Sequence, residues 1–488
     1  MTQPAAEVPS PTAGPPPAAT AAAVAAASAP VKSRYDRSIV EGPLLPAVWK
    51  LAWPAMLTNI FGGLQGIIDN ILVGHIVGFT GNAAIGVANQ IWTVVIIFIM
   101  SVFTGMSVLV ARFVGAGNEV MADRTVYQAF LTASAMAVFI LAPVGYFASP
   151  YLLQFVNATP AVQAEALPFL RIMLVCSIGM LLFFMLSGAL RAAGDARTPM
   201  VMGILLTVLN IALNIVFISG VGPLPAFGTA GAAMGTMIAS GLLGIYSLWR
   251  LIHGGWVVAF PKGQGYAPDW TIIKSLFKFG LPTGMQGIAM NIGGLLMLSV
   301  IGSLDESAQA QAAFGVSYSQ LFSLITWTSV GLLGAASAVA GQNLGAGKPE
   351  RSTEGVHVAA RIAISGAAIV GIFFMFLPRQ LLAVFGMNDP EVVSIGVQLL
   401  RVLSVSGLLV SVALTYTGGL QGTGDTKGPF YISVISQIVV PLGICFVVSR
   451  VTDLVPLHIW LAILAGHLTR CILSVVRFNQ GRWRSIRV

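Results

Sequence analysis

Charged side chains are scarce in this sequence, because Asp, Glu, Lys and Arg together make up only 9% of its 488 residues. Soluble domains usually contain about 25% charged residues. Hydrophobic residues account for 56% of the chain, and its mean hydropathy is +0.86. This composition excludes an ordinary soluble domain and predicts a membrane protein that crosses the bilayer several times.

Cysteine is also rare, and the three cysteines all lie within apolar segments, at Cys176, Cys445 and Cys471. They form no CxxC or Cys/His spacing, so neither a zinc site nor a disulfide framework is expected. The sequence contains no GxxxxGK[ST] phosphate-binding loop. We therefore expect no cofactor and no step driven by nucleotide hydrolysis. If the protein moves a solute across the membrane, an ion gradient should supply the energy.

Long apolar runs dominate what is present. A helix needs about 20 mostly apolar residues to cross hydrocarbon, and the chain contains twelve such segments. These predict an all-α protein with twelve transmembrane helices. The predicted spans are 45–76, 84–111, 125–148, 163–189, 199–220, 229–252, 272–302, 310–340, 356–377, 393–419, 429–449 and 457–477.

The basic residues predict the orientation of these spans, because short cytoplasmic loops carry an excess of Lys and Arg. One set of loops contains only Arg379 and Arg450, so the other set, which includes both termini, is predicted to be cytoplasmic. The protein is expected in the inner membrane. The formal charge of +8 is thus an orientation signal, and no nucleic-acid partner is expected. The opposite set holds Lys32, Arg34, Arg37, Lys50, Arg112, Arg124, Arg191, Arg197, Arg250, Lys262, Lys274, Lys278, Lys348, Arg351, Lys427, Arg477, Arg482, Arg484 and Arg487.

The chain repeats itself at an offset of 228 to 230 residues. LAWPAM at 51–56 resembles KFGLPTGM at 278–285, VGAG at 114–117 matches LGAG at 344–347, and LRAAGDARTP at 190–199 matches LQGTGDTKGP at 420–429. Each half has six spans, an even number, so the halves are parallel repeats. Such repeats commonly form two bundles with a substrate site between them.

This repeat predicts the domain organisation. Two pseudo-symmetric six-helix lobes are expected, joined by a cytoplasmic linker and flanked by tails. The predicted parts are a disordered Ala/Pro-rich tail (1–38), the first lobe (39–255), the linker (256–271), the second lobe (272–477) and a basic tail (478–488).

The motifs together resemble those of the multidrug and toxic compound extrusion (MATE) family. The resemblance is carried by Pro54 followed by QGIIDNILVG, by the paired GAG and GD motifs, and by LNIALNIVFI at 209–218. It implies a central cleft and export of organic cations or other amphipathic compounds in exchange for protons or sodium. NorM-like members carry further acids in the seventh and tenth spans. The corresponding stretches here, GLPTGMQGIAMNIGG and SVSGLLVSVALTYTGG, are uncharged, so the DinF-like branch is the closer likeness. We expect a monomer whose partners are small molecules and membrane lipids.

Asp69 stands out within the first span. A carboxylate in hydrocarbon costs about 2.5–3.5 kcal/mol even on insertion scales, and burial disfavours its charged form. Such a group can bind a proton at one face and release it at the other, and a nearby cation would compete with that proton. Asp69 matches the acidic residue that MATE proteins carry in this span, which implies ion coupling. The alternative is a hydrogen-bonded structural acid, or one in a water-filled entrance.

Three further polar side chains are expected at the depth of Asp69. Asn210 and Asn214 are four residues apart and so share one helix face, and Thr236 lies a similar distance from the outer end of the next span. With Asp69 they predict a proton-relay pocket, or a sodium site at Asp69, Asn210 and Asn214. Many family members have an aspartate in place of Asn214. Without that second acid a sodium ion would lack a negative ligand, so we favour protons as the coupling ion. Simple helix–helix hydrogen bonding is the alternative for the two amides.

The second half lacks this cluster. At the repeat offset Asp69 corresponds to Met297, and the two asparagines correspond to Val440 and Ile444. Symmetric packing therefore does not require the polar residues, which suggests that one lobe couples ions.

Proline and large apolar side chains complete the candidates. Pro54 removes a backbone hydrogen bond fifteen residues before Asp69 and can kink this helix; the family implies a bend that responds to protonation, and a fixed kink is the alternative. Met-rich and aromatic surfaces suit promiscuous binding. Ordinary packing is the competing interpretation for the predicted cleft residues, which are Trp92, Phe184, Met285, Met290 and Trp327.

We therefore expect a secondary active exporter and no enzyme. A lipid-linked saccharide flippase of the same superfamily is the first alternative, although such proteins often have extra spans and a cationic cavity. A membrane-embedded enzyme is the second, and it would need clustered catalytic groups that the predicted spans lack.

Overall fold

The chain forms a bundle of long helices in a computed structural model that describes residues 34–156, 159–261 and 265–487. No strand occurs in these ranges. Within these residues ten helices are long and apolar enough to cross a membrane, and the number rises to twelve when each of two bent helix pairs counts as one span. The predicted all-α, twelve-span fold class is confirmed. Residues 1–33 of the predicted Ala/Pro-rich tail lie outside the described ranges.

The first lobe is built from six spans, and two of them are bent. The second span, α4, bends by 40° between Ile97 and Met100, and the fourth consists of α7 and α8, whose axes differ by 52°. The elements of this half are α2 (Ser38–Glu41), α3 (Leu44–Ile76), α4 (Phe79–Gly115), α5 (Glu119–Met136), η1 (Ala137–Leu141), η2 (Val144–Ala148), α6 (Ser149–Phe155), α7 (Pro160–Val175), α8 (Ile178–Ala192), α9 (Arg197–Ser219) and α10 (Gly228–His253).

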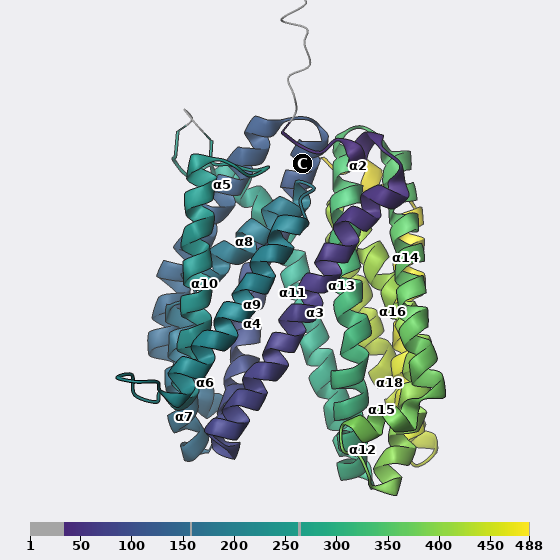
Figure 1. Cartoon of the computed structure of the whole chain (residues 1–488). Coiled ribbons are helices and arrows are strands. Elements are labelled where there is room, and N and C mark those ends of the chain that lie inside the picture. Colours follow the sequence, from purple (N-terminus) through teal and green to yellow (C-terminus); the bar gives the residue numbers. More distant parts are fainter. Residues whose placement is uncertain (1–33, 157–158, 262–264, 488) are drawn as a thin grey trace, which may run out of the picture.

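The second lobe lies beside the first (Figure 1) and is also built from six spans, although its fourth span, α16, is one continuous helix. Its first span is α11, and short π-helical turns interrupt two of the others. The elements are α11 (Trp270–Gly302), α12 (Ser307–Phe314), η3 (Gly315–Leu321), α13 (Phe322–Gly345), α14 (Pro349–Phe376), α15 (Pro378–Val384), α16 (Pro390–Gly422), α17 (Lys427–Val434), η4 (Ile435–Val439), α18 (Val440–Val451), α19 (Pro456–Asn479) and the 3₁₀ turn η5 (Arg482–Ser485).

Several helices extend beyond the apolar run that predicted them. Helix α11 begins at Trp270 because the Asp269 carboxylate accepts the backbone N–H of Thr271 at 3.0 Å. Asp389 caps α16 in the same way, accepting the N–H of Glu391 at 2.9 Å. An N-cap satisfies amides that lack helical partners. Hydropathy marks the membrane-crossing part of a helix, whereas capping sets where the helix itself begins.

The lobes pack together along two equivalent helix pairs, α3 with α13 and α11 with α4. Glycine permits the contact in both pairs. A Cβ at Gly280 would lie 1.7 Å from the Ser101 carbonyl oxygen, and one at Gly331 would lie 2.6 Å from the Met56 nitrogen. Small residues allow backbones to approach this closely. Figure 1 shows α3 crossing in front of the first lobe toward α13.

The end of the molecule that carries the described termini is closed, and the repeated GAG motifs make the contact there. A Cβ at Gly115 would lie 1.9 Å from the Gln342 carbonyl oxygen, and one at Gly345 would lie 2.1 Å from that of Arg112. The Gln342 amide also donates to the Ala192 carbonyl at 2.7 Å. The GAG motifs are therefore lobe-to-lobe contacts.

The GD motifs form equivalent turns after α8 and α16. Gly194 and Gly424 have φ values of +100° and +96°, a region that L-residues seldom adopt. Asp195 then accepts the backbone N–H groups of Arg197 and Thr198 at 3.1 and 3.0 Å. Glycine-assisted helix ends account for these motifs without a nucleotide.

Residues 34–42 form a strap across the closed end. Arg34 pairs with Asp123 of the first lobe at 2.7 Å. Lys348 of the second lobe donates to the Val40 carbonyl at 3.2 Å, and Arg351 donates to that of Ile39 at 3.3 Å. Residues 34–38, assigned to the tail on sequence grounds, are thus ordered against the first lobe.

The predicted linker and basic tail also pack on the bundle at this end. Outside 262–264, the linker contacts α5: Gln128 donates to the Ala267 carbonyl at 2.9 Å. In the tail, Trp483 is buried, and Arg112 of α4 donates to the Ile486 carbonyl at 3.0 Å. Both segments therefore reinforce the closed end.

Candidate functional site

A cavity of about 560 Å³ lies within the first lobe, between α3, α4, α7, α8, α9 and α10, and it is completed by one side chain from α13. Two members of the predicted polar cluster, Asp69 and Thr236, line it, as do three of the predicted cleft residues, Trp92, Phe184 and Trp327. No other aspartate or glutamate lines this cavity among the described residues. Asp69 is partly buried, so it is neither immersed in bulk solvent nor sealed in the core.

The four polar side chains that the sequence grouped together form one hydrogen-bonded chain. The Asn214 amide donates to Asp69 Oδ1 at 2.8 Å and to Asn210 Oδ1 at 3.2 Å. The Asn210 amide donates to Thr236 Oγ1 at 2.8 Å, and that hydroxyl donates to the Ala232 carbonyl at 2.9 Å. Both asparagines are fully buried. Three helices, α3, α9 and α10, thus converge on the carboxylate.

The convergence depends on a glycine that the sequence analysis missed. A Cβ at Gly235 would lie 2.0 Å from Asn214 Oδ1, and one at Gly231 would lie 2.4 Å from the Phe217 carbonyl oxygen. These two glycines allow α10 to pack closely against α9. The Asn214 side chain fits between the two helices only because residue 235 has no side chain. A signal was present, since GAAMG at 231–235 is a GxxxG helix-packing motif.

Gln65 and Thr207 extend the polar network and were also missed. Gln65 hydrogen-bonds Asp69 from one turn earlier on α3, and the Thr207 hydroxyl donates to Gln65 Oε1 at 3.2 Å. Both line the cavity. Residues four apart share a helix face, so the spacing of Gln65 and Asp69 was a usable signal.

One acceptor beside Asp69 is unsatisfied. Asn214 Oδ1 is buried and has no hydrogen-bond partner within the described ranges. Buried acceptors are normally paired, so the carboxylate and this oxygen together favour an added proton or cation. Within those ranges no group of three or more His, Cys, Asp or Glu side chains is arranged to hold a metal ion. Any sodium ion would therefore be held by one carboxylate and neutral oxygens.

The equivalent place in the second lobe is apolar. Met297 is buried in the core of that lobe, and Ile444 packs against the same core. The chemical difference between the lobes noted in the sequence thus corresponds to a difference in their interiors.

The predicted cleft residues divide into two groups. Trp92, Phe184 and Trp327 line the cavity, and Trp327 reaches it from the second lobe by packing on Gly63, where a Cβ would lie 2.4 Å from the indole ring. Met285 and Met290 do not line it. Both lie on α11, and the Met290 sulfur accepts a hydrogen bond from Arg470 at 3.8 Å.

Pro54 lies in the first third of α3, which remains one continuous helix through it. The Thr58 hydroxyl donates to the Pro54 carbonyl at 2.7 Å. Proline has no N–H, so the Lys50 carbonyl lacks its helical donor. A weak point therefore exists in α3, well before Asp69.

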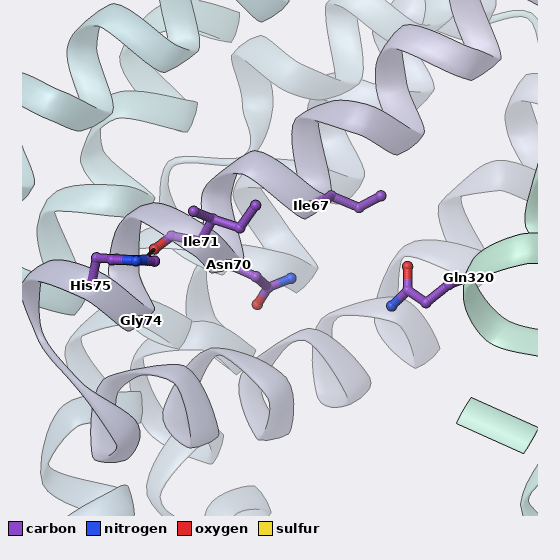
Figure 2. A pocket seen from close by; sticks show the side chains of 6 residues that line it. All are labelled: Ile67, Asn70, Ile71, Gly74, His75 and Gln320. Atoms are coloured by element: carbon purple, nitrogen blue, oxygen red, sulfur yellow. Dashed lines mark hydrogen bonds between the residues drawn. The ribbon is translucent and has the colours of Figure 1, made fainter. Parts of the chain in front are cut away.

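A second pocket, of about 580 Å³, separates α3 from η3 of the other lobe. Figure 2 shows Asn70 and Gln320 facing one another across it. Asn70 also lines the first cavity, so the end of α3 borders both spaces. This pocket lies at the far end of α3 from the closed end. At that far end the helices of the two lobes diverge (Figure 1). Its lining residues are Ile67, Asn70, Ile71, Gly74, His75 and Gln320.

Comparison with known proteins identifies similar chains over nearly the whole fold. The MatE family model matches residues 54–216 and 282–447. A probable multidrug resistance protein NorM from Thermotoga maritima is 26% identical over 434 residues, covering 89% of this chain and 92% of that protein. Another from Acinetobacter baylyi is 26% identical over 449 residues, covering 90% and 96%.

Solved structures share the fold. A crystal structure of MATE in complex with MaL6 superposes with a TM-score of 0.84, and an outward-facing multidrug resistance MATE family transporter of the MOP superfamily superposes with 0.82. Each is 21% identical, and the alignment covers 92% of this chain and 98% of the other.

Proposed function

Because the chain belongs to the MatE family of membrane transporters, we propose that it exports organic cations and other amphipathic compounds in exchange for protons, with Asp69 as the coupling carboxylate. It is a multi-pass transporter and not an enzyme. The two relatives named as multidrug resistance proteins support this substrate class. The DinF-like branch remains our assignment within the family, because the predicted seventh and tenth spans, 272–302 and 393–419, contain no acidic residue.

The observation that carries the proposal is the hydrogen-bonded chain that ends on Asp69 inside the cavity. The ionised carboxylate accepts the Asn214 amide and attracts a cationic substrate in the same space. A proton on Asp69 removes that attraction, so proton and substrate exclude one another. Exchange of one proton for one monovalent cation moves no net charge, so the pH difference drives it. Each pH unit supplies about 1.4 kcal/mol, which corresponds to roughly a tenfold concentration gradient.

Protons are favoured over sodium because Asp69 is the single carboxylate lining the described cavity. Hard cations prefer several oxygen ligands, often carboxylates. Sodium at Asp69, Asn210 and Asn214 is the second candidate for the coupling ion. Proteoliposomes loaded with ethidium and given a proton gradient or a sodium gradient separately distinguish the two.

The orientation follows from the loop charges. With both termini in the cytoplasm of a cell whose inner membrane holds the protein, the closed end faces inward and the pocket between α3 and η3 opens outward. Protons then enter from the outside, at the end of α3 where Asp69 lies. A monomer is the proposed working unit, because one chain supplies both lobes.

The test is Asp69→Asn, which keeps the shape of the side chain and removes its charge. We expect this variant to insert and melt like the wild type and to lose proton-driven ethidium efflux. Glu41→Gln makes the same chemical change at an exposed position and should leave efflux intact. Efflux at the wild-type rate by Asp69→Asn would refute the coupling role.

A further inference from the structure

Arg191 lies inside the protein, although its charge suggested a loop in the sequence. It occupies the last turn of α8 and lines the same cavity as Asp69. Its Nε donates to the Ser187 carbonyl at 3.1 Å, and its guanidinium lies over the Phe103 ring at 5.9 Å. Among the described residues no carboxylate forms an ion pair with it. The remaining guanidinium donors therefore have no acidic partner.

Arg191 and Asp69 occupy opposite ends of the cavity. Helix α3 lines it from Thr58 to Asp69 and Asn70, and α8 lines it up to Arg191. The chain just after α8 touches the strap just before α3, because a Cβ at Gly194 would lie 2.9 Å from the Ile39 side chain. Arg191 thus belongs to the closed end, and Asp69 lies eleven residues beyond Thr58, about 16 Å along the helix.

The space between the two charges is largely aromatic and apolar. Trp92, Phe184 and Trp327 line it together with Met173 and Met180. Ligand pockets of several hundred cubic ångströms typically combine such walls with a few placed polar groups. The cavity therefore has an apolar middle, an anionic end and a cationic end.

The fold itself does not require a cation at this position. The equivalent of Arg191 in the second lobe is Gln421, whose amide donates to Gln286 Oε1 at 3.1 Å. The Gln286 amide in turn donates to the Ser433 hydroxyl at 2.9 Å. At this position the second lobe has the neutral Gln421, whose amide is hydrogen-bonded within the lobe. The first lobe instead has the charged Arg191, which has no counter-ion in the described residues.

We propose that Arg191 binds the oxyanion of amphipathic zwitterions, and that these are the preferred substrates. The proposal rests on the export function argued above and specifies its substrate class. A guanidinium presents a planar fork that matches a carboxylate in a bidentate manner. Arg191 is partly buried and has no counter-ion in the described residues, so a partner of opposite charge stabilises it. The cationic group of the same molecule then lies toward Asp69. A purely cationic amphipath meets repulsion at Arg191 and binds more weakly.

The experiment compares two dyes that differ in one charge. Rhodamine B carries a free carboxylate, and its ethyl ester does not. Binding of each to the purified full-length protein is measured by fluorescence anisotropy. We expect the wild type to bind rhodamine B at least tenfold more tightly, and Arg191→Gln to abolish this preference by weakening only rhodamine B. Arg191→Lys should keep part of it. Arg197→Gln changes the exposed first residue of α9, which does not line the cavity, and should keep all of it.

Equal affinity of the wild type for the two dyes overturns the proposal without any variant. Equal weakening of both dyes by Arg191→Gln overturns it as well, since that is the result of a structural role. Proton-driven export of the ethyl ester in proteoliposomes separates this inference from the broader one. If Asp69→Asn exports the ester like the wild type, the coupling proposal fails while the dye preference still reports on Arg191.

Discussion

Gly235→Ala should disconnect Asp69 from its hydrogen-bonded chain without altering any polar residue. The added Cβ would lie 2.0 Å from Asn214 Oδ1 and 2.9 Å from the Asn214 backbone nitrogen. Non-bonded heavy atoms rest at about 3.5–4.0 Å, so the amide must move by roughly 1.5 Å or α9 and α10 must separate. Either response breaks the 2.8 Å bond from Asn214 to Asp69.

The expected cost has two parts. Overpacking a filled interior costs about 1–3 kcal/mol, and a lost hydrogen bond to a charged group costs about 1.5–3 kcal/mol. Alanine in a helix returns about 1 kcal/mol relative to glycine. The net destabilisation is therefore roughly 1.5–5 kcal/mol, which lowers the melting temperature and slows proton-driven efflux.

Gly241→Ala is the matched control, because it lies on the same helix and a Cβ there meets nothing within 4 Å. It should melt at or slightly above the wild-type temperature and export ethidium normally. The assays are thermal melting of purified protein and efflux from proteoliposomes under a proton gradient.

A double variant isolates the cause. Asn214→Ala removes the group with which the new methyl collides, so adding Gly235→Ala to it should cost less than Gly235→Ala costs in the wild type, a coupling expected of residues in contact. Fully additive losses, or wild-type efflux by Gly235→Ala, would show that Gly235 does not position Asn214.

Two further changes test other parts of the molecule. Gly345→Ala places a methyl 2.1 Å from the Arg112 carbonyl oxygen at the closed end; we expect a loss of about 1–3 kcal/mol, seen as a lower melting temperature than that of Gly334→Ala, which adds a methyl to the same helix in open space. Pro54→Ala restores an N–H toward the Lys50 carbonyl, so α3 should stiffen; we expect a higher melting temperature with slower ethidium efflux at unchanged ethidium affinity, and unchanged efflux would exclude bending at this proline.

Much of the site could be predicted because its residues obey one-dimensional rules. Asn210 and Asn214 share a face by helical spacing, and the depth of Asp69 and Thr236 follows from counting residues to the ends of apolar runs. These four side chains do form one chain of hydrogen bonds. Their roles in coupling remain predictions.

Other features depend on how each helix is turned about its axis. Met285 and Met290 lie on α11 and do not line the cavity of the first lobe, so their place in a drug cleft stays a prediction. Arg191 was assigned to a loop because a charge ends a hydropathy window. Helix α8 in fact continues to Ala192. Arg191 can lie within it because the Arg191 side chain faces a cavity instead of lipid.

By itself the sequence determined the number of spans, the duplication and the family, because hydrocarbon thickness and repeat offsets are read along the chain. Tertiary structure alone decided that Gly235 makes room for Asn214 and that the GAG motifs join the lobes. It also decided that Arg191 and Asp69 line the same cavity. These facts depend on which backbones approach within a few ångströms, and no local pattern specifies the rotation and separation of two packed helices.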